Sequence, residues 1–278
     1  MLGLLCLLAA PLNPEEVVVY ADRVVRRGAD RFFGINLNYI RDRDSNRPTA
    51  RSLDDALREA GVRFLRYPGG EKSNFYLWSE PPYEKPHPSS LGSYAGPAGD
   101  RMDFDEYMTH VRKIGAEPYV VVGCTTHARS GRTKAQWLES AVAWVRYSNV
   151  VKKYGVRYWE IGNENWHNDA FKPTEMAEIV KEFSVAMKAV DPEIRIGASG
   201  DNDAWWSRFL PPAAPYLDFL TVSQYTGWEW GGYDRFLHGP ELIETAKGAL
   251  RAIDRYTAPF DRTRLHVIVA ETNAKDYS

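Results

Sequence analysis

Residues 156–164 read VRYWEIGNE, and this stretch indicates how the chain folds. Its first part is rich in aromatic and β-branched residues, which favour a β-strand. Gly162 interrupts the strand, and the polar residues Asn163 and Glu164 follow at its carboxyl end. A mostly apolar strand that ends in polar side chains is typical of a parallel sheet with a functional site at its carboxyl edge.

The same alternation of strands and helices continues on both sides of this stretch. Strands are expected at residues 32–38, 62–67, 117–123, 156–162, 194–198, 217–225 and 265–270, and helices at residues 53–60, 104–115, 135–154, 173–190 and 241–256. Strands that alternate with helices predict parallel βαβ units. An open doubly wound sheet and a closed barrel both satisfy this pattern. Seven such strands favour an α/β fold of the TIM (β/α)8 type.

The expected barrel is one strand short, because only residues 272–278 follow the last strand and Glu271. We therefore expect a barrel that is truncated after strand 7. Residues 13–278 would form this C-terminally incomplete (β/α)-barrel catalytic domain. Irregular closure of the barrel by residues 16–20 is the alternative.

Composition excludes several classes of function. The 278 residues are enough for one barrel domain, and 44% of them are hydrophobic, which allows a sizeable core. The net charge is −2 and no basic stripe is present, so nucleic acid is not an expected partner. The chain has two cysteines and six scattered histidines without metal-ligand spacing. We therefore expect neither a metal nor another cofactor.

The first residues resemble a targeting segment. Residues 1–12 read MLGLLCLLAAPL, an apolar run shorter than the about 20 residues that a membrane-spanning helix needs. The run fits the apolar region and small-residue exit of a signal peptide, although no basic residue precedes it. We expect a signal peptide at residues 1–12 and a secreted or periplasmic protein with no membrane partner. A buried N-terminal strand or helix is the alternative.

Two glutamates are the candidate catalytic pair. Glu164 and Glu271 each stand at the carboxyl end of an expected barrel strand, so both can face one pocket at the barrel mouth. Two carboxyl groups about 5 to 5.5 Å apart can cleave a glycosidic bond with retention of configuration. The alternatives are a helix-terminal carboxylate for Glu164 and a surface loop residue for Glu271.

Three motifs support this pair by resemblance. Residues 158–165 (YWEIGNEN) resemble the acid/base motif of clan A glycoside hydrolases, in particular the α-L-arabinofuranosidase family (glycoside hydrolase family 51). Residues 66–70 (RYPGG), followed by Asn74, resemble the second-strand motif of that family, and residues 269–271 (VAE) resemble its nucleophile strand. The resemblance spans residues 32–275. It implies that Glu164 is the general acid/base and Glu271 the nucleophile.

The candidate substrate-binding residues are Arg66, Asn74, Asn163, Tyr225, Asn38 and Trp228. Arg66 would donate to Glu271 and keep it ionised. Asn163 can hydrogen-bond the sugar 2-hydroxyl. Tyr225 ends the sixth strand, where related enzymes place a tyrosine near the nucleophile; a core tyrosine is the alternative.

The sequence departs from the family in the sugar-binding positions. Asn38 stands where family 51 has a glutamate, and Ser223 stands where it has a histidine. These departures leave the arabinofuranose specificity open. Trp228, and the pair Trp205 and Trp206, are candidate stacking platforms for sugars; packing of loops onto helices is the alternative.

The sequence as a whole predicts a glycoside hydrolase that acts on polysaccharides or oligosaccharides. We expect an α-L-arabinofuranosidase-like retaining enzyme that works by double displacement without a cofactor. One alternative is an endo-β-glycanase of the same clan, a glucanase or xylanase. The other is a non-catalytic carbohydrate-binding barrel fragment.

Overall fold

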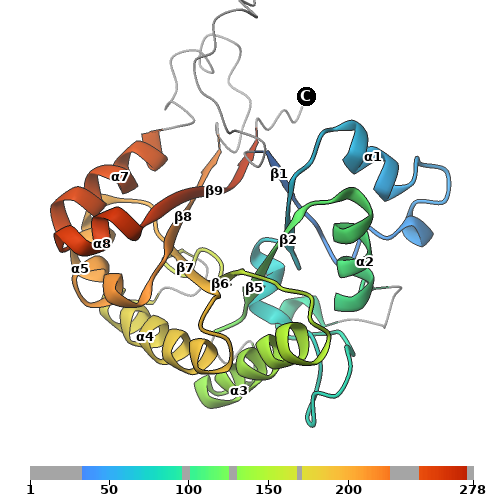
Figure 1. Cartoon of the computed structure of the whole chain (residues 1–278), viewed down its shortest axis with the longest axis horizontal. Coiled ribbons are helices and arrows are strands. Elements are labelled where there is room, and N and C mark those ends of the chain that lie inside the picture. The colour runs from blue at the N-terminus through green and yellow to red at the C-terminus, as the bar shows by residue number, and fades with distance from the viewer. Residues whose placement is uncertain (1–32, 96–100, 125–129, 168–170, 226–243, 274–278) are drawn as a thin grey trace, which may run out of the picture. The chain divides into compact units, whose positions relative to one another are not determined.

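A curved sheet of seven parallel strands forms the centre of the molecule (Figure 1). The computed structural model describes residues 33–95, 101–124, 130–167, 171–225 and 244–273. In spatial order the strands are β1 (Gly34–Asn36), β2 (Phe64–Tyr67), β5 (Glu117–Val122), β6 (Tyr158–Ile161), β7 (Arg195–Ser199), β8 (Phe219–Tyr225) and β9 (His266–Asn273). The spatial order follows the chain order, as in a TIM-type barrel.

The helices surround this ring of strands on the outside (Figure 1). They are α1 (Leu53–Glu59), α2 (Phe104–Ile114), α3 (Lys134–Val145), α4 (Pro173–Val190), α5 (Asp203–Ala213), α7 (Glu244–Tyr256) and α8 (Pro259–Arg264). Local signals set their ends: Thr133 and Gln136 form a capping box at the start of α3, and Gly115 ends α2 in the left-handed conformation. None of the helices in the described residues has both the length and the apolar character required to cross a bilayer.

The barrel is nearly closed. Strands β1 and β9 are the two edges of the sheet, and no strand pairing joins them within the described residues. Their carboxyl ends nevertheless meet, because the side chain of Asn36 on β1 donates a hydrogen bond to Glu271 on β9 at 3.2 Å. The structure thus confirms a truncated TIM-type barrel, with seven parallel strands in the described residues.

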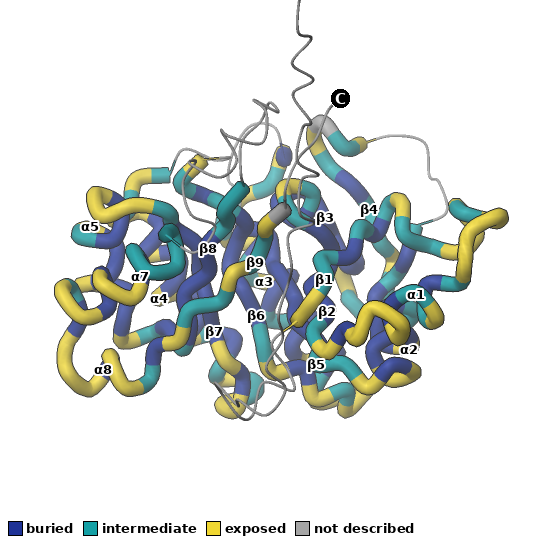
Figure 2. The backbone as a smooth tube through the Cα atoms, turned by 90° about the horizontal axis from the view of Figure 1, so that it is seen from above, coloured by how far each residue is buried: buried dark blue, intermediate teal, exposed yellow. Residues whose placement is uncertain are grey.

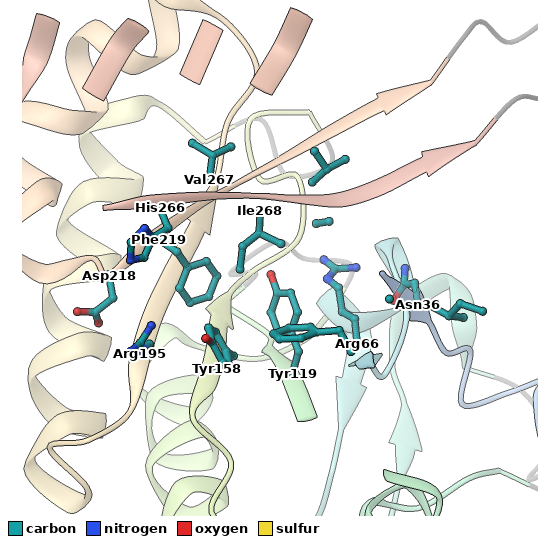
Figure 3. Close-up of a pocket in the computed structure, with 15 residues that line it drawn as sticks. Asn36, Arg66, Tyr119, Tyr158, Arg195, Asp218, Phe219, His266, Val267 and Ile268 are labelled. Atoms are coloured by element: carbon teal, nitrogen blue, oxygen red, sulfur yellow. The ribbon is translucent and has the colours of Figure 1, made fainter. Parts of the chain in front are cut away.

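A cavity of about 550 Å³ opens where β1 and β9 face each other (Figure 3). Its walls are barrel-interior side chains, among them Arg66, Tyr119 and Tyr158. In a closed barrel these positions form a packed core. The gap between the two edge strands therefore leaves part of the barrel interior accessible.

Aromatic packing accounts for much of the tyrosine and tryptophan content. Tyr67 stacks on Tyr107 with ring centroids 4.5 Å apart, and Trp78 stacks on Trp144 at 5.8 Å. Figure 2 shows the inner strands mostly buried, the edge strands β1 and β9 intermediate to exposed, and the outer faces of the helices mostly exposed. These rings lie in the layer between strands and helices, so they are core rather than sugar-binding surface.

Two segments differ from the sequence expectation. No strand or helix is predicted between residues 71 and 102, but the structure contains short elements there: η2 (Glu71–Phe75), β3 (Tyr76–Leu77), β4 (Ser89–Ser90) and η3 (Gly92–Tyr94). Trp205 and Trp206 lie on α5, a helix that the sequence analysis did not predict, and are only 6% and 1% exposed. Burial of these two rings favours packing over sugar stacking.

Three smaller elements complete the described chain. They are η1 (Asp44–Asn46), η5 (Ala214–Tyr216) and the π-helix η4 (Arg146–Val151), which extends α3. Strand β9 also runs beyond the expected strand end. The extension of β9 means that Glu271 lies within a strand, not in the loop after it.

Candidate active site

The candidate active site is a cavity of about 770 Å³ at the carboxyl ends of the strands. It is lined by segments from all around the barrel, including Asn36, Asn38, Glu164, His167, Tyr225 and Glu271. This is the rim where barrel enzymes place their chemistry. Both predicted carboxylates therefore face one cavity, although 106 residues separate them in sequence.

Glu271 is held by three donors from three other strands. Arg66 on β2 donates from Nη1 to Oε1 at 2.9 Å, and Asn36 on β1 donates to the same oxygen at 3.2 Å. The hydroxyl of Tyr225 on β8 donates to Oε2. The Glu271 side chain is only 13% exposed. These contacts fix the carboxylate in one orientation and place a cation beside it.

A β-bulge sets the position of Glu271. Along β8 and β9, Val222 pairs with Val269, but the next residue, Ser223, pairs with Glu271, so Ala270 has no partner in the register. A bulge of this kind re-aims the side chains that follow it, and such bulges are common next to active sites.

The loop after β2 approaches Glu271 closely at Gly70. A Cβ atom built on Gly70 would lie 2.5 Å from Oε1 of Glu271. A larger residue would therefore push the carboxylate away from its donors. This close approach gives a physical reason for glycine at the end of the RYPGG motif.

A tight turn after β6 aims Glu164 into the cavity. Gly162 has a φ of +68°, and a side chain there would collide with Asn165. Glu164 itself has a φ of +47°, in the left-handed region that non-glycine residues rarely adopt. Strain of this kind is often found at functional positions, where the surrounding structure enforces it.

The environment of Glu164 favours its protonated form. Burial raises the pKa of Glu164, and the negative charge of Glu271 raises it further. The hydrogen bond with Ser223 and the positive charge of Arg66 lower it, but these effects are smaller. A carboxyl group with a raised pKa can act as a general acid near neutral pH.

Asn163 and Asn74 lie behind the carboxylates. Asn163 accepts a hydrogen bond from Nη2 of Arg66 at 2.6 Å. The side chain of Asn74 is fully buried and bonds both the N–H and the C=O of Asn163, each at 3.0 Å. Neither residue is among those that line the cavity. Asn74 therefore holds the backbone of residue 163. Any effect of Asn74 on substrate binding would act through Asn163.

The other predicted substrate-binding residues have different positions. Tyr225 and Asn38 line the cavity. The side chain of Asn38 accepts from the backbone N–H of Ile40 at 3.1 Å, so it also shapes the turn after β1. Trp228 lies outside the described residues.

Several residues of the cavity were not predicted. Asn36, Trp166, His167 and Asp201 all line it. Asp201 stands two residues after the end of β7, so the rule that polar residues after strands form the site could have identified it. Burial raises the pKa of this carboxyl group. Asn36 could have been noticed as a polar residue near the carboxyl end of an apolar strand.

The fold and the rim carboxylates define the class of the protein: a (β/α)-barrel of the clan A glycoside hydrolase type. The sequence model of the family described as "Alpha-L-arabinofuranosidase 1 domain" matches residues 56–229. The match covers more than half of the chain, so the chain belongs to this α-L-arabinofuranosidase family. The resemblance to this family is thereby confirmed, and the match includes two of the three motifs, at residues 66–70 and 158–165.

Individual relatives are distant. The chain is 26% identical over 212 residues to the probable α-L-arabinofuranosidase C of Aspergillus fumigatus, covering 62% of this chain and 39% of that protein. It is 24% identical over 204 residues to an intracellular exo-α-(1→5)-L-arabinofuranosidase of Streptomyces lividans, covering 66% and 31%. The crystal structure of the Thermotoga maritima α-L-arabinofuranosidase in an arabinose complex matches with a TM-score of 0.62 and 27% identity, covering 80% and 48%. The chain thus spans less than half the length of each of these relatives.

Proposed function

We propose that the chain is a retaining O-glycoside hydrolase, with Glu271 as the nucleophile and Glu164 as the general acid/base. One observation carries this proposal. Two carboxyl groups line one cavity, and their surroundings differ: Glu271 is bonded to a buried arginine, whereas burial and the Glu271 charge raise the pKa of Glu164. Such a pair supplies one charged and one protonated carboxyl group at the same pH.

The first step of the proposed reaction forms a covalent sugar ester. A carboxylate oxygen of Glu271 bonds to the anomeric carbon while the bond from this carbon to the leaving oxygen breaks. Glu164 transfers its proton to the leaving oxygen, which departs as an alcohol. The hydroxyl of Tyr225 and the amide of Asn36 orient the attacking carboxylate.

The second step releases the sugar. Glu164, now a carboxylate, takes a proton from a water molecule, and the water oxygen bonds to the anomeric carbon. The ester bond to Glu271 breaks and its electron pair returns to the carboxylate. Two inversions at the same carbon give net retention of configuration.

The proposed substrate is a terminal α-L-arabinofuranosyl group on an oligosaccharide or polysaccharide. The family assignment and the names of the relatives support this choice. Asn38 and Ser223 depart from the family in the cavity wall, so specificity is best tested directly. A panel of aryl glycosides should show fastest hydrolysis of the α-L-arabinofuranoside. Faster hydrolysis of soluble β-glucan or xylan would contradict this substrate assignment and favour an endo-β-glycanase.

Azide rescue tests the two roles separately. With 4-nitrophenyl α-L-arabinofuranoside, Glu271→Ala should lose activity by a factor of about 10⁴ or more, since the nucleophile is gone. Added azide should restore turnover and give the glycosyl azide of inverted configuration. In Glu164→Ala, azide should instead give the product of retained configuration. Wild-type rates in either variant would show that these glutamates are not the catalytic pair.

We also propose export of this chain, on the basis of residues 1–12 alone, which lie outside the described residues. Expression in the native host followed by N-terminal sequencing checks this proposal. A mature protein that begins near residue 13 and lies outside the cytoplasm is expected. Retention of Met1 in a cytoplasmic fraction would overturn it.

A further inference from the structure

A buried arginine near the catalytic pair contacts two carboxylates at once. The Arg66 side chain is 4% exposed and the Glu160 side chain 1% exposed. Arg66 donates to Glu160 from Nε at 2.9 Å and from Nη2 at 2.8 Å, and its Nη1 donates to Glu271 at 2.9 Å. Both bonds end on one oxygen, Oε2 of Glu160, and together they hold the Nε–Nη2 edge of the guanidinium group against this carboxylate. The Nη1 group is thereby aimed at Glu271.

Glu160 itself is firmly held. The hydroxyl of Tyr119 donates to the Oε2 atom of Glu160 at 2.7 Å, and the hydroxyl of Thr221 donates to Oε1 at 2.6 Å. Arg66 and Tyr119 lie next to each other in the barrel interior (Figure 3). The four residues come from β2, β5, β6 and β8, so the cluster ties four strands together beneath the catalytic cavity.

Burial makes the charge balance of this cluster important. Although burial alone lowers the pKa of Arg66, the negative charges of Glu160 and Glu271 raise it. Arg66 therefore stays charged, and a buried cation without a counter-ion is strongly destabilising. In the protein without substrate, Glu160 and Glu271 are both counter-ions of Arg66.

The proposed double displacement changes this balance. When Glu271 becomes a sugar ester it is neutral, and Glu160 is then the carboxylate still bonded to Arg66 within the described residues. We propose that Glu160 is a positioning residue that orients Arg66 and balances its charge while the sugar is bound covalently to Glu271. The role in the reaction rests on the proposed function, whereas the charge coupling itself does not.

A double-mutant cycle in thermal unfolding tests the charge coupling without any substrate. Glu160→Gln and Glu271→Gln each leave Arg66 with one carboxylate, whereas the double variant leaves it with neither. The decrease in melting temperature of the double variant should therefore exceed the sum of the two single decreases by about 4 °C or more. Additive shifts would show that the two carboxylates do not share one buried charge, and the inference would be wrong.

A second cycle applies if Glu160→Gln alone does not fold. Arg66→Met removes the cation and leaves Glu160 as a buried, uncompensated charge. Combining Arg66→Met with Glu160→Gln removes both charges and should raise the melting temperature above that of Arg66→Met. A double variant that is no more stable than Arg66→Met would contradict the proposed pairing.

The kinetic test separates the two chemical steps. A 2-deoxy-2-fluoro arabinofuranosyl fluoride traps the sugar ester, so its formation and its hydrolysis can be measured one after the other. In Glu160→Gln the ester is left beside an unbalanced cation. Its formation should therefore slow by about tenfold, and its hydrolysis should slow less or become faster. Equal slowing of both steps would indicate a purely structural role for Glu160.

Two matched variants complete the kinetic test. Thr221→Val removes one hydrogen bond to Glu160 but keeps its charge, so the ratio of the two rates should stay near the wild-type ratio. Glu160→Asp keeps the charge, so its ratio of the two rates should be closer to the wild-type ratio than that of Glu160→Gln. If wild-type protein forms no trapped ester while the unfolding cycle shows coupling, the proposed function fails and the buried charge pairing stands.

Discussion

At the scale of single residues, Glu164 combines backbone strain with an unfavourable charge environment. Its φ of +47° lies in the left-handed region, and burial together with the charge of Glu271 raises its pKa. Both features cost folding free energy. Proteins retain such residues where function requires them, which agrees with a catalytic acid at this position.

The raised pKa of Glu164 predicts a specific pH dependence of stability. The folded protein binds this proton more tightly than the unfolded chain, whose carboxyl group titrates near the ordinary value of 4.5. Stability should therefore fall as the pH rises from about 4.5 through the raised pKa, and the loss should persist above it. Glu164→Gln does not titrate, so it should gain stability over the wild type across this window.

Urea unfolding of both proteins between pH 4 and pH 8 measures this difference. Ser207→Ala, at a partly exposed position on α5, controls for the effect of a substitution away from the cavity. A constant difference between wild type and Glu164→Gln at all pH values would contradict the assigned pKa shift.

At the scale of elements, the segment from η2 to η3 joins the core to the active site. Trp78 in this segment is fully buried, stacks on Trp144 of α3 and donates from Nε1 to the backbone oxygen of Ser140 at 3.1 Å. The same segment supplies Glu71 and Lys72 to the cavity wall. Packing far from the cavity thus fixes the position of one side of the site.

Loss of the Trp78 side chain should lower the stability of the protein. Trp78→Ala should lower the free energy of unfolding by about 3 to 5 kcal/mol, because it removes a large buried ring. Trp78→Phe keeps an aromatic ring and loses the hydrogen bond, so its loss should be smaller. Denaturant unfolding measures both values. A loss below about 1 kcal/mol in Trp78→Ala would show that the segment is not anchored there.

At the scale of the whole barrel, the described residues leave two strand edges unpaired. Strand β9 exposes Val269, which is 41% accessible, along the gap that faces β1. Unpaired edges with apolar side chains favour pairing with other molecules. The same gap opens onto the cavity of about 550 Å³, which is lined by barrel-interior side chains (Figure 3).

A charge on the β9 edge should therefore reduce self-association. Val269→Lys should remain monomeric at protein concentrations where the wild type associates, because lysine on an edge opposes strand pairing. Val185→Lys on α4 is the matched control, since Val185 is also exposed, at 56%, but lies on a helix. Sedimentation velocity measures the association. Equal behaviour of wild type and Val269→Lys would rule out this edge as the contact.

The sequence alone determined the kind of fold and the identity of the main polar residues. Alternation of apolar strands and amphipathic helices depends on local periodicity, so it could be predicted, and the helix at residues 173–190 was predicted with the bounds it has. The same rule placed Glu164 and Glu271 at strand ends, because the carboxyl ends of parallel strands share one rim.

Only the tertiary structure decided which side chains meet. The contacts of Arg66 with Glu160 and Glu271 join residues 94 and 205 positions apart, and no local pattern encodes such distances. The bulge that pairs Ser223 with Glu271 depends on the register between two strands, and the burial of Trp205 and Trp206 depends on how α5 packs. Local sequence sets backbone preference and periodicity, whereas register and side-chain contacts depend on how the whole barrel packs.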